Sequence, residues 1–95
     1  MNRFKGNEGR IQNIEDIKRD LDRAVDEKYA IIEIATGNIR ESKKRMETEP
    51  MSDIEYNALK QNVALNQSII DQSLTDLHEI FKRIAELDQE VENSK

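Results

Sequence analysis

The chain has 95 residues, of which 36% are hydrophobic, 37% are charged and 4% are aromatic. This length leaves room for one domain, and the composition favours an elongated helical structure, because each helix must bury only one stripe of side chains. The net charge of −5 argues against a broad nucleic-acid-binding surface, the absence of cysteine excludes disulfides and thiolate metal sites, and no apolar run approaches the ~20 residues that span a bilayer.

Residues 1–12 are predicted to form a flexible N-terminal arm, because Gly6 and Gly9 stand there among polar and charged residues. The arm is basic, but no apolar segment of the kind found in secretory signals follows it. We therefore expect a cytoplasmic protein without a membrane partner.

A first helix is predicted over about residues 13–47, with Asn13 as its N-cap. Its apolar residues recur at seven-residue steps, with one four-residue step between Leu21 and Val25 that predicts a stutter in the heptad pattern. The series comprises Ile14 and Leu21, then Val25, Ile32, Ile39 and Met46. Gly37 has three interpretations: a kink, a break in the helix or a close contact between helices. A continuous or gently kinked helix is favoured, because Ile39 stays in phase with Ile32.

A turn is predicted at residues 48–51, and a second helix over about residues 52–92. Pro50 disfavours helical backbone at Glu49. Ser52 and Glu55 have the spacing of a capping box, in which each side chain bonds the backbone N–H of the other.

The second helix carries a heptad seam, which predicts a coiled-coil-like partner helix. Because a short turn joins antiparallel neighbours, residues 13–93 are predicted to form an all-α, long antiparallel helical hairpin. The residues expected in its core or interface are Val63, Ile70, Leu77, Ile80, Ile84, Leu87 and Val91, flanked by Leu74 and Phe81 and facing Ile32 and Ile39.

Two helices alone do not cover all of the apolar surface. The pair Ile31 and Ile34 widens the stripe of the first helix, and Leu74 and Phe81 widen that of the second. We therefore expect a homo-oligomer, or docking on another protein.

No residue constellation indicates catalysis, a cofactor or a metal. His78 is the only histidine, and no second ligand lies three or four residues from it on the helix. The carboxylates are spread along helix faces, and no phosphate-binding loop or nucleophile–base pair is apparent. The sequence predicts a protein that is not an enzyme.

A basic cluster near the end of the first helix has two interpretations. Arg40, Lys43, Lys44 and Arg45 are favourably placed near a helix C-terminus, where cations complement the helix dipole. Alternatively, they contact the phosphates of a nucleic acid, with strongly salt-dependent affinity.

The architecture over residues 13–92 resembles the central oligomerisation domain of small terminase subunits from myovirus-type tailed bacteriophages. The resemblance lies in a long polar helix, the charged turn at 47–50 and a second helix with a heptad seam. It implies a non-catalytic assembly protein in the host cytoplasm, which works with a large ATPase subunit in DNA packaging. It assigns no functional residues.

Overall fold

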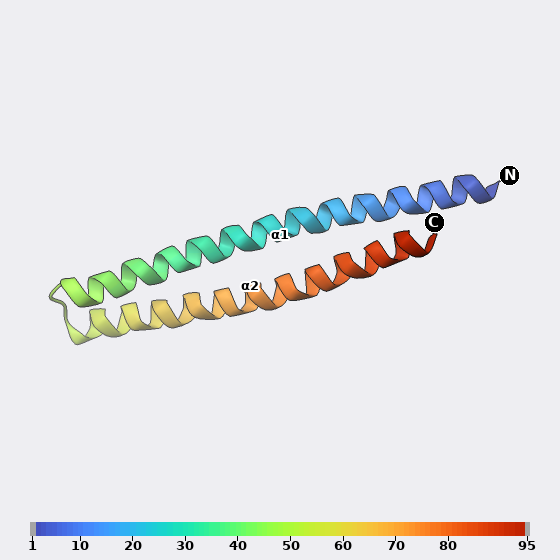
Figure 1. The fold of residues 1–95 in the computed structure, drawn as a ribbon. Coiled ribbons are helices and arrows are strands. Elements are labelled where there is room, and N and C mark those ends of the chain that lie inside the picture. The colour runs from blue at the N-terminus through green and yellow to red at the C-terminus, as the bar shows by residue number, and fades with distance from the viewer. Residues whose placement is uncertain (1, 95) are drawn as a thin grey trace. The chain divides into compact units, whose positions relative to one another are not determined.

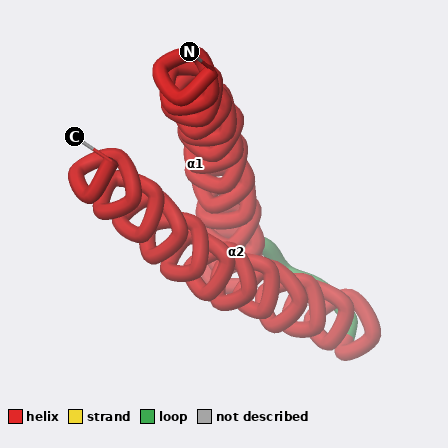
Figure 2. Tube along the Cα trace, turned by 90° about the vertical axis from the view of Figure 1, so that its right-hand side faces the viewer, coloured by secondary structure: helices red, strands yellow, loops and turns green. Residues whose placement is uncertain are grey.

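The computed structural model describes the backbone of residues 2–94 and the side chains of residues 12–94. Two α-helices, α1 (Asn2–Thr48) and α2 (Asp53–Ser94), are joined by one short loop (Figure 1). In the view turned by 90°, the described chain again consists of helices and the loop, with no strand (Figure 2). The predicted all-α antiparallel helical hairpin is confirmed.

Helix α1 begins earlier in the sequence than predicted. Its first described residue is Asn2, so residues 2–12, expected as a flexible arm, have helical backbone, while Met1 lies outside the described residues. The physical reason is that starting a helix is the unfavourable step, whereas extending an existing helix by one residue is nearly neutral. Gly6 and Gly9 lower the helix propensity of this segment but do not end the helix.

Gly37 lies in the interior of α1, which continues through it to Thr48. A Cβ atom built on Gly37 would meet no atom within 4 Å. No glycine in the described chain has a positive φ. The continuous helix that the sequence favoured is therefore present, and Gly37 marks neither a break nor a close contact between helices.

The loop between the helices comprises residues 49–52, one residue later than the predicted turn at 48–51. At the end of α1, the Glu49 N–H donates to the Arg45 carbonyl oxygen at 2.9 Å. At the start of α2, the Glu55 N–H donates to Ser52 Oγ at 3.2 Å, which is the serine half of the predicted capping box.

The hairpin divides into two packing units, which we describe separately: unit 1 comprises residues 1–27 and 77–95, and unit 2 comprises residues 28–76. In unit 1, the side chains of Ile14, Leu77 and Leu87 are buried. Around them, Lys18, Leu21, Val25, Ile80, Ile84 and Val91 are half-buried.

The burial pattern of unit 1 corrects the predicted stutter. The least exposed positions of α1 there include Ile14, Lys18, Leu21 and Val25, so four-residue and three-residue steps alternate. The step from Leu21 to Val25 is thus an ordinary step between two seam positions. The sequence interpretation missed this because it counted only apolar residues, and Lys18 is charged.

Unit 2 has a different core, made of small and polar side chains. Its buried residues are Ala35, Ser42, Asn66 and Ser73. The predicted seam residues Ile32, Ile39, Val63 and Ile70 are half-buried beside them. The seam of unit 2 therefore removes less apolar surface from water than a seam of leucine and isoleucine would.

Candidate interaction surface

A polar cluster crosses the seam of unit 2. Asn38 Nδ2 on α1 donates to Asn66 Oδ1 on α2 at 3.2 Å. Asn66 Nδ2 donates in turn to Asn62 Oδ1 at 2.8 Å, and Ser42 Oγ donates to the same oxygen at 3.4 Å. Asn66 is only 6% exposed and Ser42 only 7%. These bonds supply the partners that buried polar groups require.

The same contacts define the register of unit 2. The residue numbers sum to 104 in each of three cross-helix pairs: Lys28–Asp76, Asn38–Asn66 and Ser42–Asn62. In two antiparallel helices, a constant sum means that the register of one helix against the other is the same at all three pairs. Residues whose numbers sum to 104 therefore lie level with each other along this unit.

A cross-helix ion pair lies in each unit. In unit 1, Lys18 pairs with Asp88, and the hydrogen bond to Asp88 is the main reason why the pKa of Lys18 is raised above its ordinary value. In unit 2, Lys28 Nζ lies 2.9 Å from Asp76 Oδ2. The hydrogen bond from Lys28, helped by one from Gln72, lowers the pKa of Asp76 below its ordinary value.

Exposed aliphatic side chains gather on one side of unit 2. On α1, Ile31 and Ile34 precede Asn38 by seven and four residues, so they share a side of the helix with it. On α2, Leu65 and Ile69 follow Asn62 by three and seven residues and share its side in the same way. Because Asn38 and Asn62 both bond Asn66, the two pairs lie on the same face of the unit. We name this surface the aliphatic face: Ile31, Ile34, Leu65 and Ile69.

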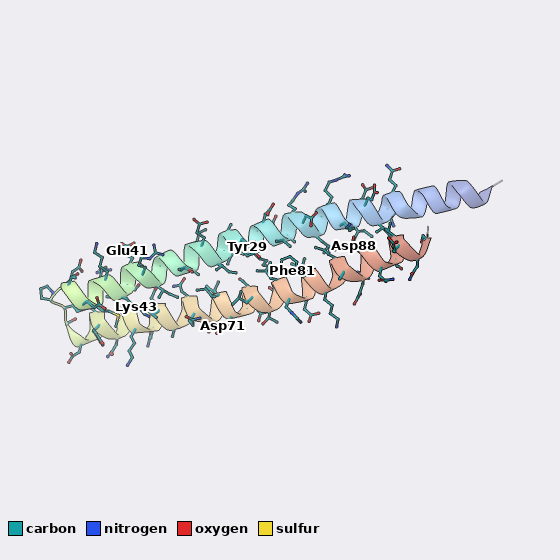
Figure 3. All side chains as sticks on the ribbon, in the orientation of Figure 1. Tyr29, Glu41, Lys43, Asp71, Phe81 and Asp88 are labelled. Atoms are coloured by element: carbon teal, nitrogen blue, oxygen red, sulfur yellow. The ribbon has the colours of Figure 1, made fainter. Side chains whose placement is uncertain are left out.

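The opposite side of α2 in unit 2 carries Leu74, which is 52% exposed. Leu65 and Leu74 are nine residues apart, which is two and a half helical turns, so they point in opposite directions. Tyr29 of unit 2 and Phe81 of unit 1 are also exposed, and both are labelled in Figure 3. The predicted apolar flank at Leu74 and Phe81 is therefore exposed in the structure.

The structure does not bring all four residues of the basic cluster to one face. Lys43 and Arg45 are two residues apart, so they point to different sides of α1. Arg45 Nε pairs with Glu49 Oε2 at 3.0 Å, whereas the described residues provide no ion pair for Arg40, Lys43 or Lys44. Figure 3 shows Lys43 on the side of α1 that faces α2 and Glu41 on the other.

Lys60, on α2, is a further cation near the basic cluster, and the sequence analysis did not include it. Lys43 and Tyr56 line the same surface hollow of unit 2, together with Met46 and Glu47. Lys60 follows Tyr56 by four residues, hence by about one helical turn on the same side of α2. The register of unit 2 places Lys60 level with Lys44, because their numbers also sum to 104. The sequence pattern of one helix does not reveal this register, so Lys60 was not grouped with the basic cluster. Glu47 offsets part of the positive charge there.

The described residues contain no group of three or more histidine, cysteine, aspartate or glutamate side chains placed to hold a metal ion. His78 is exposed on α2. Within the same described residues, no helix is long and apolar enough to cross a membrane.

Comparisons with known proteins found no match to this chain among protein-family models, curated proteins or solved structures.

Proposed function

We propose that the chain is a non-catalytic helical interaction protein that assembles by covering its aliphatic face, first of all with a second copy of itself. The observation that carries this proposal is the distribution of side chains in unit 2. Ile34 and Leu65 are 66% and 63% exposed, while alanine, serine and asparagine occupy the buried seam.

The energetics favour association through this face. Fully burying a leucine or isoleucine side chain stabilises a protein by about 1.5–3 kcal/mol. In unit 2 this contribution is only partly used: the most buried seam positions carry small or polar residues, and the aliphatic residues of the seam are only half-buried. A second helical surface on the aliphatic face would bury four large aliphatic side chains, all of them uncharged.

A second copy is the simplest occupant. In a two-fold dimer the same patch serves both partners, so one set of side chains covers another set of the same kind. The aliphatic face suits such pairing, because each helix contributes two of its four residues and none is charged. A different protein that presents an amphipathic helix is the alternative occupant.

Light scattering coupled to size exclusion, over a range of concentrations, tests the proposal. We expect the wild-type chain to form a discrete oligomer and Leu65→Glu to be monomeric and still helical. The matched control is Leu74→Glu, which places the same charge at a similarly exposed leucine on the opposite side of α2. A monomeric wild-type chain at high concentration, or equal loss of association in both variants, would contradict association through the aliphatic face.

A nucleic-acid-binding role, like that of a phage small terminase subunit, is the second candidate. It is supported by Arg40, Lys43 and Lys44, which have no ion-pair partner among the described residues and so remain available for phosphates. An oligomer would repeat this cluster and increase its avidity.

A further inference from the structure

We propose that the polar cluster of unit 2 is a pairing-specificity device, which selects the register that places Asn38 opposite Asn66 over slipped and interchain helix pairings. The cluster comprises Asn38, Ser42, Asn62 and Asn66. This role is independent of what covers the aliphatic face.

Asn66 is the centre of the cluster, because it uses both ends of its carboxamide. Its Oδ1 accepts from Asn38 across the seam, and its Nδ2 donates to Asn62 Oδ1 and to the Asn62 carbonyl oxygen, each at 2.8 Å. No buried side-chain nitrogen or oxygen in the described chain lacks a partner. A fully bonded network of this kind is tied to one arrangement, since hydrogen bonds are directional and aliphatic contacts are not.

The sequence on both sides of Asn38 shows what a slip would do. A shift of α1 by one heptad in either direction keeps the seam stripe on the same side of the helix. In one direction the shift places Ile31 at the level of Asn66, and in the other it places Arg45 there. Ile31 has no side-chain group that can hydrogen-bond the Asn66 carboxamide. The Arg45 side chain has only donors, so it cannot accept a hydrogen bond from the amide N–H groups of Asn66.

The rest of the unit 2 seam gives weaker discrimination. Ala35 and Ser73 are small, and the half-buried aliphatic residues beside them make contacts that are not directional. A buried asparagine in a heptad seam can fix register and partner number where the hydrophobic residues do not, at a cost in stability. In unit 2 the polar cluster provides this directionality in the buried part of the seam, whereas the Lys28–Asp76 ion pair lies at the edge of the seam, with both side chains about a third exposed.

The test measures the register inside single chains. The chain has no cysteine, so Glu33→Cys and Asp71→Cys introduce two unique spin-label sites. Both positions are exposed, and they lie level with each other because their numbers also sum to 104. Pulsed electron paramagnetic resonance, in an excess of unlabelled chain, then reports only the distance within one chain.

We expect one narrow distance distribution for the wild-type background and a broadened or split one for Asn66→Leu, with helicity retained. The matched control is Asn57→Leu, an identical change at an exposed asparagine of α2 outside the cluster, which should leave the distribution narrow. If Asn66→Leu does not fold, Asn66→Ala removes the same side-chain bonds without added volume and decides the question.

A narrow, unshifted distribution in the folded Asn66 variant would overturn the proposal. The result does not depend on oligomer mass, because spin dilution removes the interchain distances. Failure of this proposal and failure of self-association through the aliphatic face are therefore distinguishable.

Discussion

Lys28 and Asp76 join α1 to α2 in unit 2 through an ion pair with a Nζ–Oδ2 distance of 2.9 Å. Lys28 occupies a half-buried position that falls seven residues before the buried Ala35, in the series that faces α2. A charged residue is tolerated there because its long aliphatic stem covers apolar surface while its ammonium group reaches the edge of the seam.

This ion pair predicts a specific loss of stability in acid. Because the pKa of Asp76 is lowered below its ordinary value of 3.8, the folded state favours the charged carboxylate. The stabilisation is present above the ordinary pKa and is lost as the pH falls through the lowered one. We expect the free energy of unfolding, measured with denaturant from about pH 5 downwards, to fall more steeply for the wild-type chain than for Asp76→Asn. Equal pH dependence would show that Asp76 is not coupled to folding.

Replacing Gly37 with alanine is expected to stabilise the hairpin by about 1 kcal/mol, because glycine is the weaker helix former in a helix interior. The added Cβ atom would meet nothing within 4 Å. Thermal unfolding at low protein concentration should therefore show a higher Tm. A lower Tm that appears only at high concentration would mean that a partner chain approaches α1 at Gly37.

Ser52→Ala is expected to destabilise the hairpin by about 1 kcal/mol, the usual effect of removing an N-cap side chain. The change deletes the acceptor for the Glu55 N–H at the start of α2. Ser52→Asp should restore most of the stability, and Ser68→Ala, at an exposed site within α2, serves as the control. If both alanine variants unfold at the same denaturant concentration, the cap does not stabilise α2.

Leu77→Asp is expected to reduce helicity and association together, because it places a carboxylate at a position that is only 4% exposed. An uncompensated buried charge costs more than about 2 kcal/mol, a large share of the stability of a small helical protein. The control, Leu74→Asp, lies three residues earlier on α2 and is half exposed. Circular dichroism and solution mass unchanged in Leu77→Asp would contradict its assignment to the seam.

The seam of α2 was predictable from the sequence, because most of its positions carry large apolar residues at heptad spacing. The seam of α1 was only partly predictable. Ala35 and Ser42 are buried, yet alanine is only a weak signal of a core position and serine is none. Their burial depends on what lies opposite them across the seam.

The aliphatic face shows the same limit more clearly. Ile31 and Ile34 were expected to need a cover, but Leu65 and Ile69 join them only because Asn38 is opposite Asn66. That register is a tertiary property, set by the loop and by the cross-helix bonds. The pattern of apolar residues in one helix therefore predicts the apolar stripe of that helix. It does not predict which residues of the other helix lie beside that stripe and complete the aliphatic face.

The nucleic-acid candidate predicts salt-dependent retention on DNA that depends on Arg40, Lys43, Lys44 and Arg45. Each phosphate contact contributes about 0.9 to the slope of log affinity against log salt, so replacing all four with glutamine should flatten that slope markedly. The control removes the same charge from exposed positions outside the cluster: Arg19, Arg23, Lys82 and Arg83. Retention absent at low salt, or reduced equally by both sets of changes, would exclude a specific DNA-binding role for the cluster. Because binding by four cations on one acidic chain is weak, the assay should use the oligomer, in which the cluster is repeated.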